Sequence, residues 1–210
     1  MKKLIFAIPI LLALVLFATP LAETTFVAFD TETTGFSPAK ERIIEIGAVK
    51  YRNGKIVASN HWLINPGIPI NNSFVHNITD EMVAGHPPFA DTYKAFVRFV
   101  GDGVLLAHNA SFDVRFMQAE IERNHLEPLP NPVLDSLALF RKWYPDAPSH
   151  KLGALAERLG VPTGSEHRAE DDSRTLLLIL DQWLGQHPSL TLEQLRTEAN
   201  GFYYFDGSRR

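Results

Sequence analysis

Two acidic residues stand two positions apart in the stretch VAFDTETTG, residues 27–35. The apolar, β-forming residues before them are typical of a strand from about Thr25 to Asp30. Side chains alternate along a strand, so Asp30 and Glu32 share one face and Thr31 takes the other. Both acids fall at the carboxyl end of this strand, where open α/β sheets bind their ligands. We therefore expect these carboxylates to do chemistry.

A third acid follows another apolar run. The stretch AHNASFD, residues 107–113, ends a predicted strand and places Asp113 in the first turn of the next helix. Asp113 then also lies beyond the carboxyl end of a strand. An acid at this place favours the helix N-terminus electrostatically even without another role, so Asp113 alone does not establish a site.

The stretch HRAEDDS, residues 167–173, carries a histidine and further acids. His167 and Asp172 are five residues apart, which is roughly 140° around a helix. They converge only if His167 lies in the loop before the helix and Asp172 lies on an early turn. Helical phase favours Asp172 over Asp171 as the inward-facing acid, without excluding Asp171, because Asp172 shares a stripe with Leu176, Ile179 and Leu180.

These residue types together suit one kind of chemistry. Carboxylate oxygens without cysteine are the ligands that hard cations such as Mg²⁺ or Mn²⁺ prefer. Two such ions can clamp the attacking and leaving oxygens of a phosphoryl displacement. A histidine with an unperturbed pKa of about 6.5 suits proton abstraction from water near neutral pH. The candidates are His167, Asp30, Glu32, Asp113 and Asp172.

The bulk composition limits the alternatives. The chain has 210 residues, 45% of them hydrophobic, and a formal net charge of −4, which suits one globular domain with a core. An acidic chain is not a general nucleic-acid coat protein, because phosphate binding normally rests on Lys and Arg. Metal cations would supply the missing positive charge. The chain has no cysteine, which excludes disulfides, thiolate catalysis and cysteine zinc sites.

The N-terminus differs from the rest of the chain. Two lysines precede the uncharged apolar run of residues 4–18, and TPLAE follows. This is the order of a secretory signal, with Ala22 as the last residue of the cleaved piece. We predict a signal peptide or an N-terminal membrane anchor in residues 1–22, with membrane attachment through residues 4–22 in the second case. The protein is then exported (periplasmic or secreted) or membrane-anchored; with a misassigned start it is cytoplasmic.

The elements that position these residues follow from periodicity and turn signals. Residues 42–66 predict two strands joined at Asn53-Gly54, a strong hairpin turn. Residues 103–109 and 131–136 predict a fourth and a fifth strand. Asn109 or Ser111 is expected to cap the helix that follows the fourth strand, and Asp135 the helix after the fifth. Further helices are expected over 89–100, 137–144, 150–160 and 169–184. This order predicts an α/β fold, a mixed five-stranded sheet with helices on both faces.

The three motifs in this order and spacing resemble those of the DEDDh group of exonucleases, which includes the proofreading epsilon subunit of bacterial DNA polymerase III. The connecting segments, such as VHNITDEM and HKLGALAERLGV, are similar to the family as well. The resemblance covers roughly residues 24–184 and implies a ribonuclease H-like fold, two divalent metal ions (Mg²⁺ or Mn²⁺) and 3′-to-5′ hydrolysis that releases nucleoside monophosphates. We accordingly expect an exonuclease domain over 23–186 and a C-terminal extension over 187–210.

The resemblance also implies roles for single residues. Asp30, Glu32 and Asp172 match metal-binding acids, Asp113 matches the acid of the second metal, and His167 matches the general base. A second set matches the substrate pocket: the backbone around Thr33 and Thr34 with Phe36 beside it as the cradle for the terminal nucleotide, Asn109 in the lining, and His108 as a residue that helps to shape it.

The expected substrate is the 3′ end of single-stranded DNA or RNA. A polymerase partner is not expected, because no long polymerase-binding tail follows the last family helix. A phosphodiesterase acting on very short oligonucleotides is a variant of the same enzyme class. The alternative from another class is a non-catalytic nucleic-acid-binding module on the same fold, since a fold does not prove an activity.

Overall fold

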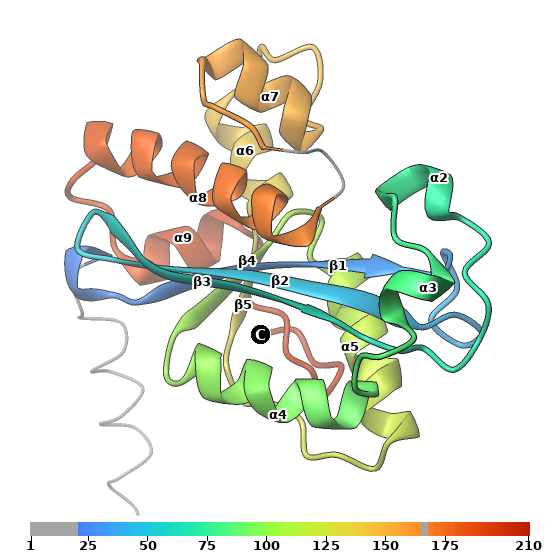
Figure 1. Cartoon of the computed structure of the whole chain (residues 1–210). Helices are drawn as coiled ribbons and strands as arrows, with labels where there is room; N and C mark the ends of the chain where they lie inside the picture. The colour runs from blue at the N-terminus through green and yellow to red at the C-terminus, as the bar shows by residue number, and fades with distance from the viewer. Residues whose placement is uncertain (1–20, 165–167) are drawn as a thin grey trace, which may run out of the picture.

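The computed structural model describes residues 21–164 and 168–210 (Figure 1). A five-stranded sheet with the order β3-β2-β1-β4-β5 forms its centre. The strands β1 (Phe26–Thr33), β2 (Ile43–Arg52) and β3 (Lys55–Leu63) are antiparallel neighbours. The strands β4 (Val104–Ala107) and β5 (Val133–Asp135) extend the sheet in parallel with β1. The predicted mixed sheet is confirmed.

The β2–β3 hairpin turns at the predicted dipeptide. Asn53 has a φ of 52° and Gly54 a φ of 74°, the left-handed conformations that a tight two-residue hairpin needs. The first strand is longer than predicted, because β1 pairs with β2 as far as Thr33. Asp30 and Glu32 therefore lie within the strand, and the regular pairing across from Gly47 and Glu45 fixes both side chains on one face of the sheet.

Helices cover both faces of the sheet, as predicted (Figure 1). One face carries α4 (Phe89–Val100) and α5 (Ser111–Arg123); their apolar residues pack with Val27 and Phe29 of β1. The other face carries α8 (Ala169–Gln186) and α9 (Leu192–Glu198), together with α6 (Ser136–Trp143) and α7 (Leu152–Leu159); these pack with Phe26 and Ala28. Alternate β1 residues thus enter two separate cores, and Asp30 continues the series that faces α8.

The start of α5 differs from the prediction. Its N-cap is Ala110, which has no side-chain cap, whereas Asn109 takes a left-handed φ of 63° and Ser111 is the first helical residue. Asp135 explains the difference, because its carboxylate accepts hydrogen bonds from the backbone N–H groups of both Asn109 and Ala110. The same carboxylate caps α6 through the N–H of Leu137, so the predicted structural role of Asp135 is confirmed.

The remaining elements are short. A 3₁₀ turn (Leu21–Glu23), α2 (Ser73–His76) and α3 (Asp80–Val83) were not expected from the sequence, nor was α9. Residues 202–210 return to the sheet, where Tyr203 bridges to Val133 of β5 and Phe205 is buried. No helix within residues 21–164 and 168–210 is long and apolar enough to cross a membrane. Residues 1–20 of the predicted leader lie outside the described residues.

Candidate active site

Three carboxylates from two elements converge on the α8 face of the sheet. Asp30 and Glu32 come from β1, and Asp172 comes from the first turn of α8. One carboxylate oxygen of each lies within 4.8 Å of those of the other two. Asp172 rather than Asp171 takes this place, as the helical phase predicted. Three oxygens at this spacing suit a single hard divalent cation.

A glycine in β2 permits the close approach of α8. A Cβ atom on Gly47 would lie 2.1 Å from the carbonyl carbon of Ala169 and 2.1 Å from the amide nitrogen that follows it. Ser173 secures the same crossing, because its hydroxyl lies 3.3 Å from the Gly47 carbonyl oxygen and donates to the Ala169 carbonyl oxygen at 2.7 Å. The first turn of α8 therefore rests directly on the sheet, and this brings Asp172 over β1.

A buried ion pair anchors the residue before α8. Glu45 of β2 is only 1% exposed and lies opposite Glu32 in the strand register. Its carboxylate accepts hydrogen bonds from Arg168 Nη2 at 2.9 Å and from the backbone N–H of Ala169 at 3.2 Å. Sequence reasoning missed both Glu45 and Gly47. The signal for Glu45 was an acid in the middle of an apolar strand, which requires a partner when it is buried.

Asp113 approaches β1 from the opposite face. It lies on α5 and is buried, and its Oδ1 accepts hydrogen bonds from the backbone N–H of Thr31 at 3.1 Å and from the Thr31 hydroxyl at 2.8 Å. Asp113 is not a member of the three-acid group, although its charge acts on both Asp30 and Glu32. The structure thus brings all four predicted acids to one strand, three on one face and the fourth tied to its backbone.

The acids repel one another without a cation. Burial raises the pKa of Asp30 well above its usual range, and the charges of Asp113, Glu32 and Asp172 add to this. Burial, followed by the charge of Asp172, raises the pKa of Glu32 to about 8. Burial also raises the pKa of Asp113 to about 7, against the hydrogen bonds from Thr31. A divalent cation would remove both the desolvation penalty and the repulsion, so the donor set fits a metal ion.

The loop after β1 places an aromatic ring in solvent. Thr33 donates to the Gly35 carbonyl oxygen at 2.7 Å, and the Thr34 hydroxyl donates to Glu41 Oε2 at 2.5 Å. Both threonine side chains are buried and bonded within the loop. The Thr34 N–H also donates to the Arg42 carbonyl oxygen at 2.9 Å, and the Thr33 carbonyl oxygen accepts from Asn72 Nδ2 at 2.8 Å. Phe36 is 87% exposed, which is unusual for a large apolar side chain.

His108 is a structural residue. Its Nε2 lies 2.8 Å from the His150 carbonyl oxygen and must donate to it, and its Nδ1 lies 3.0 Å from the Ser136 hydroxyl. Burial lowers the pKa of His108, which favours the neutral ring, with the Ser136 hydroxyl donating to Nδ1. His108 thus ties the segment around His150 to the end of β4; its role in shaping the substrate pocket stays a prediction.

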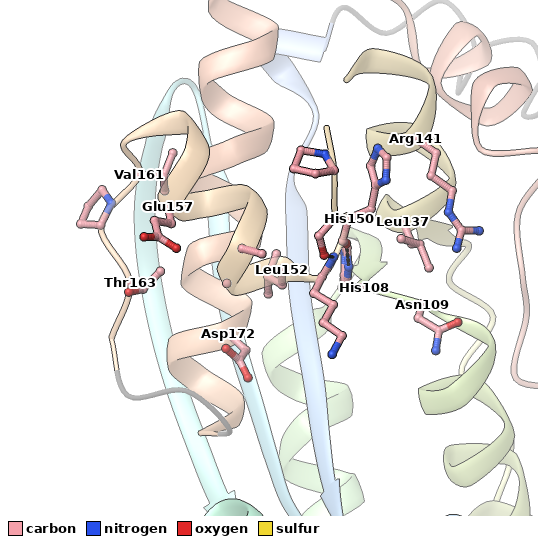
Figure 2. Close-up of a pocket in the computed structure, with 16 residues that line it drawn as sticks. His108, Asn109, Leu137, Arg141, His150, Leu152, Glu157, Val161, Thr163 and Asp172 are labelled. Carbon is pink, nitrogen blue, oxygen red and sulfur yellow. Dashed lines mark hydrogen bonds between the residues drawn. The ribbon is translucent and has the colours of Figure 1, made fainter. Parts of the chain in front are cut away.

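A groove of about 1190 Å³ leads away from the acid cluster. Figure 2 shows Asp172 on one side of this groove and Asn109 and Arg141 on the other. The lining comes from the end of β4, from α6, from α7 with the segments on either side of it, and from Asp172 of α8. The predicted base His167 lies outside the described residues, so its role stays a prediction.

Comparisons with known proteins decide the family. A family model described as exonuclease matches residues 27–180. The chain belongs to this exonuclease family. It is 39% identical over 184 residues to the PolC-type DNA polymerase III of Streptococcus suis and 42% identical over 157 residues to that of Clostridium perfringens. These matches cover 85% and 74% of the chain, yet only 13% and 11% of the polymerases.

Solved exonuclease structures share the fold. Exonuclease X in complex with 5′ overhanging duplex DNA is 28% identical, with a TM-score of 0.69, over 83% of this chain and 99% of that one. The nuclease domain of 3′hExo, a DEDDh family member bound to rAMP, has a TM-score of 0.72 over 82% of this chain and 97% of that one; at 19% identity it shows the fold alone. The predicted ribonuclease H-like fold is confirmed, and so is membership of the exonuclease family.

Proposed function

We propose that this exonuclease removes nucleoside monophosphates from the 3′ end of single-stranded DNA or RNA. The observation that carries the proposal is the convergence of Asp30, Glu32 and Asp172 beside an open groove, with Asp113 tied to the same strand. Exonuclease X, which is 28% identical over 99% of its chain, was solved with 5′ overhanging duplex DNA, and this supports a DNA terminus as one substrate.

The four acids would hold two Mg²⁺ or Mn²⁺ ions. Asp30, Glu32 and Asp172 would form the first site, and Asp113 would contribute to the second together with Asp30. When bound, the ions activate the attacking water and neutralise charge on the scissile phosphate and on the leaving oxygen. The metal-free site favours protonated carboxyl groups, so binding of the ions releases protons.

The chain's own groups would do the remaining work. His167 would accept the proton of the attacking water. The backbone of the loop around Thr33 and Thr34 would hold the terminal nucleotide, and the exposed Phe36 ring would stack on its base. Glu45 and Arg168 would keep the start of α8 against β2, and with it the position of Asp172.

The test is a gel assay on the purified full-length chain. We expect 5′-labelled single-stranded DNA or RNA to shorten from the 3′ end with Mg²⁺ or Mn²⁺ and to stay intact with chelator. Asp30→Ala should abolish the ladder, whereas Asp102→Ala, an exposed acid in the turn before β4, should retain it. A wild-type rate in Asp30→Ala would refute the metal assignment. Strand binding without shortening would instead favour the non-catalytic binding module.

We propose in addition that residues 1–22 direct export or membrane anchoring. The support is the order of charged, apolar and small residues in the sequence. A polymerase partner stays a separate question: the polymerases that the chain resembles carry this domain within much longer chains. Fractionation of cells that express a tagged copy, with sizing of the product, tests the leader; a full-length product in the cytosol would refute it.

A further inference from the structure

Two cations in the groove have no acidic partner among the residues that the structure describes. Arg141 on α6 and Lys151 at the start of α7 are exposed and line the groove. Neither side chain takes part in an ion pair within residues 21–164 and 168–210, whereas Arg168 and Arg174 are paired with carboxylates. Unpaired cations gathered in a groove on an acidic protein are suited to an anionic ligand.

The segment that carries Lys151 is held in place. His108 at the end of β4 donates to the His150 carbonyl oxygen, and the His150 ring bonds the Tyr144 carbonyl oxygen at 3.0 Å. The backbone N–H of Lys151 donates to the Ser149 hydroxyl at 3.2 Å. These bonds fix the backbone of this segment between β4 and α6. The Lys151 ammonium group can therefore reach a ligand in the groove without a change in the main chain.

Arg141 is anchored through the start of its helix. The carboxylate of Asp135 caps α6 and also accepts from the backbone N–H of Asn109, which joins α6 to the end of β4. Figure 2 shows the Arg141 side chain across the groove from Asp172 and beyond Asn109. The groove therefore presents Asp172, where metal ions would sit, on one side and Arg141 on the other; Glu157 of α7 is the second acid in its lining.

This order of charges matches a polynucleotide strand. A metal-filled acid cluster binds the scissile phosphate, but it offers nothing to the phosphates that precede it. Those phosphates are the anions nearest to the cluster in any substrate longer than a dinucleotide. Arginine and lysine are the side chains that bind phosphate oxygens, arginine through its fork and lysine as a point charge. A mononucleotide ester would fill the cluster and leave both cations without an anion.

We propose that Arg141 and Lys151 bind the backbone phosphates on the 5′ side of the scissile phosphate, so that the enzyme selects single strands of three or more nucleotides over mononucleotide esters. This inference rests on the proposed function, because it takes the acid cluster as the place of the scissile phosphate. It assigns the groove to the part of the strand that stays on the enzyme after cleavage.

The experiment compares two substrates on the same enzyme. The substrates are the p-nitrophenyl ester of thymidine 5′-monophosphate, which reaches only the acid cluster, and the octanucleotide of thymidine. We expect the double variant Arg141→Gln, Lys151→Gln to lower the ratio of kcat/KM for the octanucleotide to kcat/KM for the ester by about 10- to 100-fold. The matched control is Arg158→Gln, an exposed cation on α7 outside the groove lining, which should keep the wild-type ratio.

Salt dependence gives a second readout. Each phosphate contact to a single strand contributes about 0.7 to the slope of log affinity against log salt. The double variant should therefore lose about 1.4 from this slope, measured by fluorescence anisotropy of labelled octanucleotide with Ca²⁺ in place of Mg²⁺. An unchanged ratio and an unchanged slope in a folded double variant would overturn the inference.

The two proposals fail in different ways. If the wild-type chain hydrolyses the ester but the double variant keeps the wild-type ratio and slope, the groove assignment is wrong and the exonuclease assignment stands. If the wild-type chain hydrolyses neither substrate, but the anisotropy slope still falls in the double variant and not in Arg158→Gln, the groove assignment stands and the proposed hydrolysis is wrong. Circular dichroism on each variant establishes that it is folded.

Discussion

Replacing Glu32 by glutamine should stabilise the protein in the absence of metal ions. Glu32 is buried on β1 among the other acids of the site, and burial together with the charge of Asp172 raises its pKa from 4.5 to about 8. The side chain of glutamine has nearly the same shape and no charge. The substitution therefore removes the desolvation and repulsion and leaves the packing of β1 unchanged.

The magnitude follows from the pKa shift. Because the pKa of Glu32 is higher in the folded state, its contribution to stability is fully present below pH 4.5 and is lost as the pH rises to about 8. At pH 7 the loss spans about 2.5 pH units, since 7 − 4.5 = 2.5, which corresponds to about 3 kcal/mol. We expect Glu32→Gln to exceed the wild-type free energy of unfolding by this order at pH 7 and by little at pH 5.

The assay is urea denaturation in chelator at several values between pH 5 and pH 8, repeated with saturating Mg²⁺. Metal bound only to the native state adds about 2.7 kcal/mol at a concentration one hundred times Kd. The wild-type chain should gain this increment. The variant should gain less because it lacks one carboxylate, so the difference between the two should shrink or reverse with Mg²⁺.

The control is Glu127→Gln, an exposed acid in the loop before β5, which should change the free energy of unfolding by less than about 0.5 kcal/mol at every pH. The reasoning is wrong if Glu32→Gln in chelator is less stable than the wild-type chain at pH 8. It is equally wrong if the difference does not grow between pH 5 and pH 8, because carboxylate repulsion must increase as the carboxyl groups lose their protons.

Three further substitutions test other contacts. Arg168→Gln leaves the buried Glu45 without its cation and should lower the free energy of unfolding by about 2–4 kcal/mol in urea denaturation; restoration by lysine would support a charge effect. Thr31→Val removes the hydroxyl donor to Asp113 and should raise the pKa of that acid further, so the acidic limb of the pH–rate profile should move upward; an unmoved limb would contradict this. Phe205→Ala should cost about 3–5 kcal/mol, measured by thermal denaturation, and a loss under 1 kcal/mol would show that the C-terminal segment is not part of the core.

Local signals in the sequence predicted the elements that local physics determines. The Asn53-Gly54 turn and the end of α7 at Gly160 both require left-handed backbone, and both fall where expected. The inward phase of Asp172 followed from the apolar stripe on its own helix. In each case the residues that carry the signal are neighbours in the chain, so no knowledge of distant contacts was needed.

The errors and omissions concern contacts between distant segments. Asn109 or Ser111 was predicted to cap α5. The carboxylate that accepts from the backbone N–H groups of Asn109 and Ala110 instead belongs to Asp135, 26 residues away from Asn109. Glu45 likewise finds its partner Arg168 across 123 residues. The local sequence identified the bond from Asp135 to α6, but nothing near either acid identifies the distant group that it binds. The short helices α2 and α3 have too few residues to show a periodic pattern.

The contact at Gly47 has a consequence for the cation that the site accepts. The backbone of α8 lies against this glycine. The distance between the helix and the sheet at this point sets how far the carboxylate of Asp172 lies from those of Asp30 and Glu32. Mg²⁺ requires oxygens at about 2.0–2.1 Å in near-ideal geometry, whereas Ca²⁺ accepts about 2.3–2.6 Å in looser arrangements. A methyl group at position 47 would act as a spacer between helix and sheet, and would shift the preference of the site from small ions towards larger ones. The absence of a side chain at Gly47 thus favours a small cation at the three carboxylates.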